Sequence, residues 1–152
     1  MHHPPASHEP SPFDCTLCFE IYAANLAFGR IYKPLLDPLG LTYPQFLVMM
    51  TLWAGDGLSV GAIGDQLGLD SSTLTPLIKR LEGAELVTRR RDSRDERRVI
   101  VSLTEKGARL EGQSDQVLSS IRDATGLNAR EAQKLHESMR QLRTRLTGAP
   151  LA

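Results

Sequence analysis

The stretch from Leu69 to Leu103 constrains the fold more than any other part of the chain. It reads LDSSTLTPLIKRLEGAELVTRRRDSRDERRVIVSL. Apolar residues recur at three- and four-residue spacing in its first part, which predicts one apolar stripe along a helix. These residues are Leu74, Leu77, Ile78 and Leu81. Two later segments, Leu86 to Thr88 and Val99 to Val101, have the composition of β-strand cores. The charged run between them is too polar to be buried, so it should project as the loop of a hairpin.

A short helix followed by a basic hairpin outlines a winged helix-turn-helix. The non-apolar side of the helix is hydroxylic and basic, and such side chains bond base edges and phosphates of DNA. An arginine at a hairpin tip can enter a narrow minor groove. Arg94 is the candidate, with Asp95 and Arg97 expected to pair and stiffen the loop. The residues expected to contact DNA are Ser71, Ser72, Thr73, Thr75, Lys79, Arg80, Arg91, Arg94 and Arg97. A merely solvated hairpin is the alternative, and the preceding helices and flanking strands argue against it.

The charge distribution supports the same interpretation. The whole chain is neutral, with 18 Lys and Arg residues against 18 Asp and Glu residues. Between Lys79 and Arg98, however, eight basic residues accompany five acidic ones, so this segment carries +3 and the remainder −3. A local basic patch on a neutral protein suits a nucleic-acid binder that must also leave its site.

The rest of the chain predicts a mainly α fold of the α+β class, with one domain over residues 13–148. Residues 1–12 hold four prolines and three histidines without periodicity, so a flexible arm is expected there. The winged helix-turn-helix should span residues 42–103, and residues 13–36 and 104–148 should be dimerisation helices.

Helix caps mark the boundaries of these elements. Thr42, Ser59 and Thr104 each precede an expected helix, and the helix after Thr104 should run through Ile121 without interruption. The last helix has an apolar stripe at heptad-like spacing, for which the chain offers no obvious cover. Terminal helices of two subunits that pack together would bury this stripe, so we expect a symmetric homodimer.

The cysteines of the chain, Cys15 and Cys18, form a C-x-x-C in the expected first helix. They are not a disulfide framework, and the chain shows neither a signal-peptide pattern nor a membrane-spanning run, so a cytoplasmic protein is expected. Zinc would need further ligands, and apart from the tail histidines only His136 is available, so no metal or cofactor is expected. Cys18 lies near the helix start, where the positive end of the helix dipole favours a thiolate. A small buried hydrophobic residue is the alternative role for such a cysteine.

Three tyrosines accompany Cys18. Tyr22 lies one turn along the helix and Tyr32 lies on the same seam, while Tyr43 would approach if the first two helices pack as a pair. Phenol hydroxyls that donate to a thiolate stabilise its charged form, and a thiolate is the species that peroxides oxidise to sulfenic acid. Pocket walls and cores share residue types. The apolar residues that either line a site for organic hydroperoxides or form core are Phe19, Leu47, Met50 and Trp53.

The order of the helices, the helix-turn-helix and the wing sequence DSRDERR resemble MarR-type transcriptional regulators. Three segments, LCFEIY, IYKPLLDPLGLTYPQFLVM and LDSSTLTPLIKRLE, are similar to the organic-hydroperoxide-sensing repressors of the OhrR type. The resemblance implies a dimeric repressor that leaves a pseudo-palindromic double-stranded DNA operator when a cysteine of the first helix is oxidised. It implies that Cys18 is the peroxidatic cysteine and that Tyr32 and Tyr43 are its hydrogen-bond partners. Tyr22 and Cys15 are further candidates.

One branch of that family resolves the sulfenic acid with a second cysteine in the C-terminal helices, and no cysteine follows Cys18 here. A mixed disulfide with a low-molecular-weight thiol and a bond to Cys15 are the remaining routes. Two other functions stay open. The first is a MarR-type regulator that binds a small aromatic effector non-covalently. The second is a thiol-dependent redox enzyme, although the lack of a βαβ pattern around the cysteines argues against it and we expect no enzyme.

Overall fold

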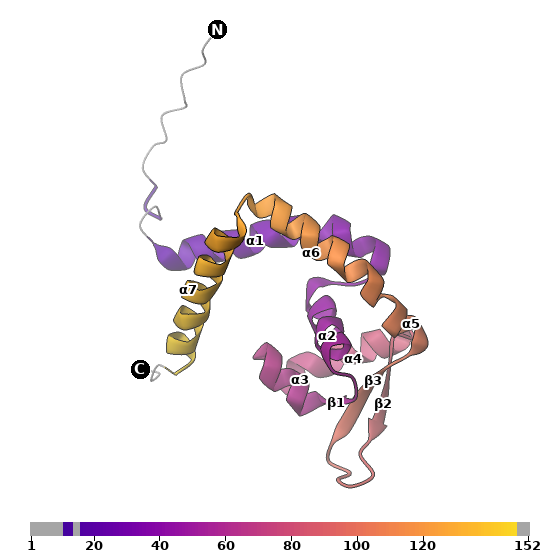
Figure 1. Ribbon diagram of the computed structural model, residues 1–152. Coiled ribbons are helices and arrows are strands. Elements are labelled where there is room, and N and C mark those ends of the chain that lie inside the picture. Colours follow the sequence, from indigo (N-terminus) through magenta and orange to yellow (C-terminus); the bar gives the residue numbers. More distant parts are fainter. Residues whose placement is uncertain (1–10, 14–15, 149–152) are drawn as a thin grey trace.

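The computed structural model describes residues 11–13 and 16–148 and has the architecture of a winged helix-turn-helix (Figure 1). Its elements in chain order are α1 (Leu17–Leu36), the 3-10 helix η1 (Asp37–Leu39), α2 (Tyr43–Ala54), β1 (Leu58–Ser59), α3 (Val60–Leu67), α4 (Ser71–Gly83), β2 (Val87–Arg91), β3 (Val99–Leu103), α5 (Glu105–Arg109), α6 (Glu111–Thr125) and α7 (Ala129–Thr147). α1 and α6 pack side by side as one layer, and α2, α3, α4 and the sheet lie beneath it (Figure 1). The expected mainly α fold class is therefore confirmed. The first ten residues of the expected arm, and Cys15, lie outside the described residues.

The helix-turn-helix consists of α3 and α4, and side-chain caps define where each begins. Ser59 caps α3 by accepting a hydrogen bond from the N–H of Ala62 at 3.1 Å, and Asp70 caps α4 by accepting from the N–H of Thr73 at 2.8 Å. Gly68 ends α3 in the left-handed region, with a φ of 68°, which glycine adopts without strain. The predicted stripe of α4 faces the core: Leu74, Ile78 and Leu81 are buried and Leu77 is half-buried.

Within the described residues, the sheet has three antiparallel strands in the order β1-β3-β2. β2 and β3 pair from Val87 opposite Leu103 to Arg91 opposite Val99. Both strands extend beyond the predicted segments, because cross-strand main-chain hydrogen bonds continue through charged residues as well as apolar ones. The sequence prediction missed β1, which pairs Leu58 with Val101. A strand of two residues is too short for side-chain alternation to reveal it.

The single long helix expected after Thr104 is wrong, because the structure has α5 and α6 with a break at Leu110. Thr104 does cap α5, with its Oγ1 accepting from the N–H of Gly107 at 3.0 Å. The same hydroxyl donates to the carbonyl oxygen of Glu85 at 2.6 Å, so α5 is tied to the start of the wing. α6 packs along α1 instead. One straight helix cannot follow both directions, and the chain turns at the half-buried Leu110.

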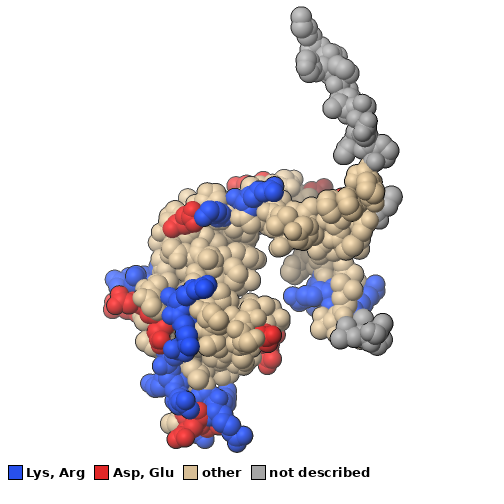
Figure 2. Space-filling view, turned by 180° about the vertical axis from the view of Figure 1, so that it is seen from behind, with Lys and Arg blue, Asp and Glu red and all other residues tan. Residues whose placement is uncertain are grey.

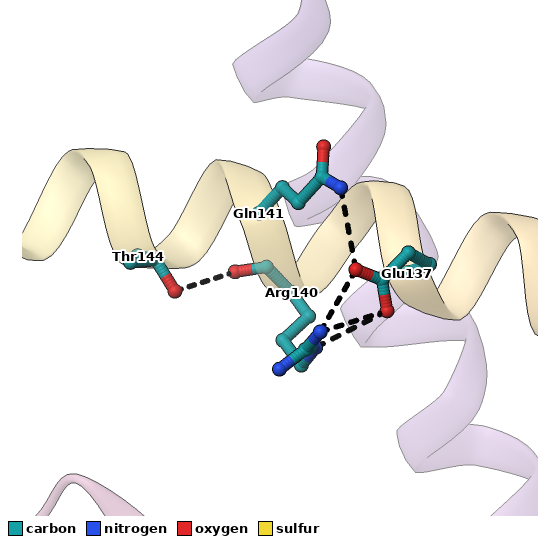
Figure 3. A network of polar contacts seen from close by, with 4 residues as sticks. All are labelled: Glu137, Arg140, Gln141 and Thr144. Atoms are coloured by element: carbon teal, nitrogen blue, oxygen red, sulfur yellow. Dashed lines mark hydrogen bonds and ion pairs between the residues drawn. The ribbon is translucent and has the colours of Figure 1, made fainter.

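α7 extends away from the α1 and α6 layer, and none of its residues is buried (Figure 1). Side chains on the polar side of α7 form hydrogen bonds with one another. The carboxylate of Glu137 accepts from Arg140 at 2.8 Å and from Gln141 at 3.2 Å (Figure 3). These hydrogen bonds lower the pKa of Glu137. Leu135 and Leu146 on the apolar side are 53% and 66% exposed, so the described chain leaves the stripe uncovered, as the sequence predicts. None of the described helices combines the length and apolar character that crossing a membrane requires.

Candidate DNA-binding surface and thiol site

The N-terminal half of α4 presents hydroxyl groups that its cap holds in place. Asp70 accepts from the hydroxyl of Ser72 at 2.7 Å as well as from the N–H of Thr73, and these hydrogen bonds lower the pKa of Asp70. The Thr75 hydroxyl donates to the carbonyl oxygen of Ser71 at 2.7 Å. Both hydroxyl hydrogens are therefore engaged within the helix, and the oxygens remain able to accept hydrogen bonds from outside.

Most of the predicted contact residues of α4 are exposed to solvent. They are Ser71, Ser72, Thr73, Lys79 and Arg80, while Thr75 is half-buried. The predicted contact side of this helix is therefore available to a partner.

The hairpin between β2 and β3 carries the wing, where arginine side chains gather (Figure 2). Asp95 and Arg97 form the expected ion pair at 3.7 Å, and the Arg97 side chain is still 96% exposed. The N–H of Arg94 donates to Asp92 at 3.0 Å in the turn. Arg91 donates to the carbonyl oxygen of Glu96 at 3.2 Å. Internal contacts thus shape the loop, while the guanidinium of Arg94 makes no hydrogen bond or ion pair with the described residues.

An ion pair between α4 and β2 escaped the sequence reasoning. Arg89 donates to Glu82 at 2.9 Å, and both side chains are partly shielded from solvent. The hydrogen bond from Arg89 is the main reason that the pKa of Glu82 lies below its usual value. This contact fixes the wing against α4, the recognition helix of the helix-turn-helix, so Arg89 holds the two elements together and is not one of the unpaired basic side chains of the wing. No local sequence motif predicts the pair of Arg89 with Glu82, because it forms only when β2 packs against α4.

A cleft of about 410 Å³ lies where α3, α4 and the wing meet. Its lining residues are Ser59, Val60, Gly61, Ser71, Thr75, Arg97, Arg98 and Val99. Exposed arginines and the N-terminal N–H groups of a helix both favour an anion. The residues predicted from sequence to contact DNA did not include Ser59, Gly61 or Arg98. They become candidates only because the fold brings the start of α3 to the base of the wing.

Tyr32 and Tyr43 meet between α1 and the start of α2. Their ring centroids are 4.4 Å apart, and their exposed fractions are 8% for Tyr32 and 39% for Tyr43. Burial, the neighbouring phenol of Tyr43 and a hydrogen bond with it raise the pKa of Tyr32 to about 12. The sequence expectation that the first two helices pack as a pair therefore agrees with the structure.

Cys18 is exposed and is the second residue of α1. Tyr22 is also exposed and lies one turn further along the same helix. Tyr32 is on α1 too, and at 1.5 Å per residue it is about 21 Å along the axis from Cys18. The thiol therefore cannot touch the tyrosine pair of its own chain. Sequence spacing along one seam suggested a proximity that a straight helix of this length excludes.

The other residues considered for a hydroperoxide pocket are also separated in one chain. Phe19 stacks on Phe13, with ring centroids 5.1 Å apart, near the start of α1. Trp53 instead lies at the far end of α2, where it packs on Phe46 with centroids 6.0 Å apart. Leu47 and Met50 are half-buried on α2. Met50 and Trp53 therefore pack against the core, while Phe19 is exposed.

An exposed hydroxylic and basic helix beside an arginine-bearing wing defines the class of DNA-binding transcriptional regulators. The family model described as Transcriptional regulator SarA/Rot matches residues 30–111. The HTH-type transcriptional regulator TtmR of Methylorubrum extorquens is 46% identical over 138 residues, which make up 91% of this chain and 71% of that protein. The Organic hydroperoxide resistance transcriptional regulator of Bacillus subtilis is 43% identical over 130 residues, or 86% of this chain and 84% of that protein.

Among solved structures, reduced AbfR bound to DNA superposes with a TM-score of 0.72 at 34% identity, covering 88% of this chain and 93% of that one. AbfR is a protein of Staphylococcus epidermidis. It has also been solved as an overoxidised form bound to DNA and in a disulfide-formed state. The present chain belongs to the MarR-type family of winged-helix transcriptional regulators.

Proposed function

We propose that this regulator is a homodimeric repressor that releases its DNA operator when an organic hydroperoxide oxidises Cys18. The observation that carries the proposal is the placement of an exposed thiol at one end of α1 and a hydrogen-bonded tyrosine pair at the other. The Bacillus subtilis relative, named for organic hydroperoxide resistance, supports the stimulus. AbfR, solved in reduced and disulfide states, supports a redox signal.

A dimer can bring Cys18 of one subunit close to the tyrosine pair of the other subunit, although the two are far apart within one chain. α1 exposes large apolar residues, and a groove of about 610 Å³ between α1 and α7 is lined by Ile21, Met139, Leu142 and Leu146, among others. A second copy that covers these surfaces around a two-fold axis can place the two α1 helices antiparallel. The start of one α1 then lies beside the end of the other. In this arrangement the Cys18 thiol of each subunit faces the Tyr32 and Tyr43 hydroxyls of the other.

The oxidation itself uses one thiol and one hydroperoxide. The Cys18 thiolate attacks an oxygen of the hydroperoxide, so an S–O bond forms and the O–O bond breaks. Sulfur loses two electrons, the hydroperoxide is reduced to its alcohol, and protonation yields the sulfenic acid. A low-molecular-weight thiol then condenses with the sulfenic acid to give a mixed disulfide and water. Cys15 is the alternative partner for this second step.

DNA release follows from the geometry of a dimer on its operator. Two recognition helices must be spaced to match two half-sites about one helical turn apart. The residues proposed to hold the DNA are Ser71, Ser72, Thr73, Thr75, Lys79, Arg80, Arg91, Arg94 and Arg97. A sulfenic acid or mixed disulfide alters the hydrogen bonds of the Tyr32 and Tyr43 pair and so the junction of α1 with α2. The protein acts by binding and not as an enzyme, in the cytoplasm where its operator is.

The experiment compares variants at the two cysteines on DNA that the reduced protein itself selects from a random pool. Cys18→Ser should bind as tightly as wild type and stay bound after cumene hydroperoxide treatment, as fluorescence anisotropy would show. Cys15→Ser, the matched control, should release like wild type if a small thiol resolves the sulfenic acid. Normal release by Cys18→Ser would refute the proposal.

A cavity of about 180 Å³ between α1 and α6 favours a second candidate, a small aromatic effector bound without a covalent bond. Phe28, Ile31 and Ile121 contribute to its apolar lining. This alternative predicts release by an aromatic compound after both cysteines are blocked by alkylation. Release that disappears on alkylation supports the thiol mechanism instead.

A further inference from the structure

A chain of aromatic rings leads from the tyrosine pair into the DNA-binding unit. The Tyr32 ring contacts Tyr43 at a centroid distance of 4.4 Å and Phe46 at 6.3 Å. Phe46 is fully buried and meets Trp53 edge-on at 6.0 Å. Tyr43, Phe46 and Trp53 all belong to α2, so the rings follow one helix from its first residue almost to its last. Because protein interiors are close-packed, a displacement of one ring in this chain is passed on to the ring that it contacts.

The far end of this ring chain is bonded to the support of the wing. The indole Nε1–H of Trp53 donates to the carbonyl oxygen of Gly107 in α5 at 2.9 Å. Gly107 in turn packs so closely on Leu86, just before β2, that a Cβ would overlap the Leu86 carbonyl oxygen. Thr104, three residues before Gly107, also contacts Leu86. Its N–H donates to the Leu86 carbonyl oxygen at 3.0 Å. A displacement of Gly107 is therefore passed directly to the strand that carries the wing arginines.

A second contact joins the same end of α2 to the other strand of the wing. Asp56, two residues after α2, accepts from the N–H of Leu103 at 2.8 Å and from the N–H of Gly57 at 2.8 Å. Leu103 is the last residue of β3. Both strands of the wing are thus held from the C-terminal end of α2, while the N-terminal end of α2 carries Tyr43.

From this geometry we infer that Trp53 is a positioning residue, which transmits the state of the tyrosine pair to the wing through its hydrogen bond with Gly107. The inference rests on the proposed function, because it assumes that oxidation of Cys18 disturbs Tyr43. α2 then acts as a rigid rod whose rotation or shift changes the angle of the wing. Spatial continuity alone does not establish coupling between two sites, so the test must measure coupling directly.

The first experiment uses Trp53 as its own reporter, because it is the one tryptophan in the sequence. Full-length protein without DNA is titrated with cumene hydroperoxide, while mass spectrometry follows oxidation of Cys18. The emission of Trp53 should change in step with the oxidation, because its indole loses or alters a specific hydrogen bond. Cys18→Ser should show no change, and Tyr43→Phe should show a smaller one. Complete oxidation of Cys18 with unchanged tryptophan emission overturns the inference.

The second experiment measures the ratio of operator affinities between the reduced and oxidised forms. Trp53→Phe keeps an aromatic ring beside Phe46 but removes the N–H donor. In Trp53→Phe the ratio of operator affinities between the reduced and oxidised forms should be about tenfold smaller than in wild type. Such a change lies within the roughly 5- to 150-fold range typical of allosteric coupling. The control is Ile63→Val, a fully buried change in α3 outside the ring chain, which should keep the wild-type ratio.

The possible results separate this inference from the proposed function. If wild type is not oxidised at Cys18, or is oxidised without releasing DNA, the proposed function fails. If wild type releases DNA normally while Trp53→Phe has the wild-type ratio of reduced to oxidised operator affinities, only the inference fails. An equal loss of ratio in Trp53→Phe and Ile63→Val also overturns it, because general destabilisation would then explain both.

Discussion

Replacement of Gly107 by alanine tests how closely α5 packs on the wing. The added Cβ would lie 3.0 Å from the carbonyl carbon of Leu86 and 3.3 Å from its Cα, and it would overlap the carbonyl oxygen. These atoms are main chain and cannot rotate away, so α5 or the start of β2 must move. The move strains contacts that both elements make, including the hydrogen bond from Trp53 to Gly107.

The cost follows from what overpacking does in other proteins. Forcing an extra carbon into a filled site destabilises by about 1–3 kcal/mol. In a domain of this size, each kcal/mol lowers the melting temperature by roughly 2–4 °C, so Gly107→Ala should melt about 2–12 °C below wild type. Gly112→Ala is the matched control, because a Cβ at Gly112 on α6 meets nothing within 4 Å. Alanine in a helix is favoured over glycine by roughly 0.5–1 kcal/mol, so this control should melt slightly higher than wild type.

Thermal unfolding followed by circular dichroism measures both variants at one protein concentration, because dimerisation makes the midpoint concentration-dependent. Gly107→Ala should also bind operator DNA more weakly, since its wing is displaced. A melting temperature of Gly107→Ala equal to or above that of Gly112→Ala would refute the argument. It would mean that the contact with Leu86 relaxes without cost.

Three further predictions concern charges and the tyrosine pair. The pKa of Glu82 is lowered in the folded state, so its ion pair with Arg89 stabilises the protein above the ordinary carboxyl pKa and is lost on acidification. Glu82→Gln should therefore flatten the acid side of a stability–pH curve measured by urea unfolding. The pKa of Tyr32 rises from 10.0 to about 12, so its contribution is complete below pH 10.0 and disappears as the pH rises towards 12. Tyr32→Phe should reduce that alkaline loss, and an unchanged curve would contradict the burial argument. Arg94→Ala and Arg97→Ala should each lower the slope of log affinity against log salt by about one, whereas equal slopes in anisotropy titrations would show that neither arginine reaches a phosphate.

Local sequence patterns predicted much of the fold because local physics determines those parts. The caps at Ser59 and Thr104 bond to main-chain N–H groups three residues away, so they can be recognised within a few letters of sequence. The apolar stripe of α4 is periodic on one helix. The ion pair of Asp95 with Arg97 spans two residues. Each of these features needs no information from distant parts of the chain.

Features that join distant segments could not be predicted in the same way. The strand β1 exists because Leu58 meets β3 at Val101. The break at Leu110 exists because α5 and α6 pack on different partners. The pair of Arg89 with Glu82 forms across α4 and β2. In each case the deciding contact is set by tertiary packing, which a one-dimensional pattern does not record.

By itself, the sequence determined that this protein is a winged helix-turn-helix with hydroxyl and basic groups on its recognition helix and arginines on its wing. Helix periodicity and turn chemistry depend only on nearby residues, so they can be recognised from the sequence without a structure. Only the tertiary structure decided that the ring of Tyr32 on α1 packs against the ring of Tyr43 on α2. Only the packing of α2 decided that Trp53 bonds to Gly107 at the base of the wing. Contacts between distant segments depend on how rigid helices pack, whereas the separation of Cys18 from Tyr32, about 21 Å, follows from the rise of the single helix α1 at about 1.5 Å per residue.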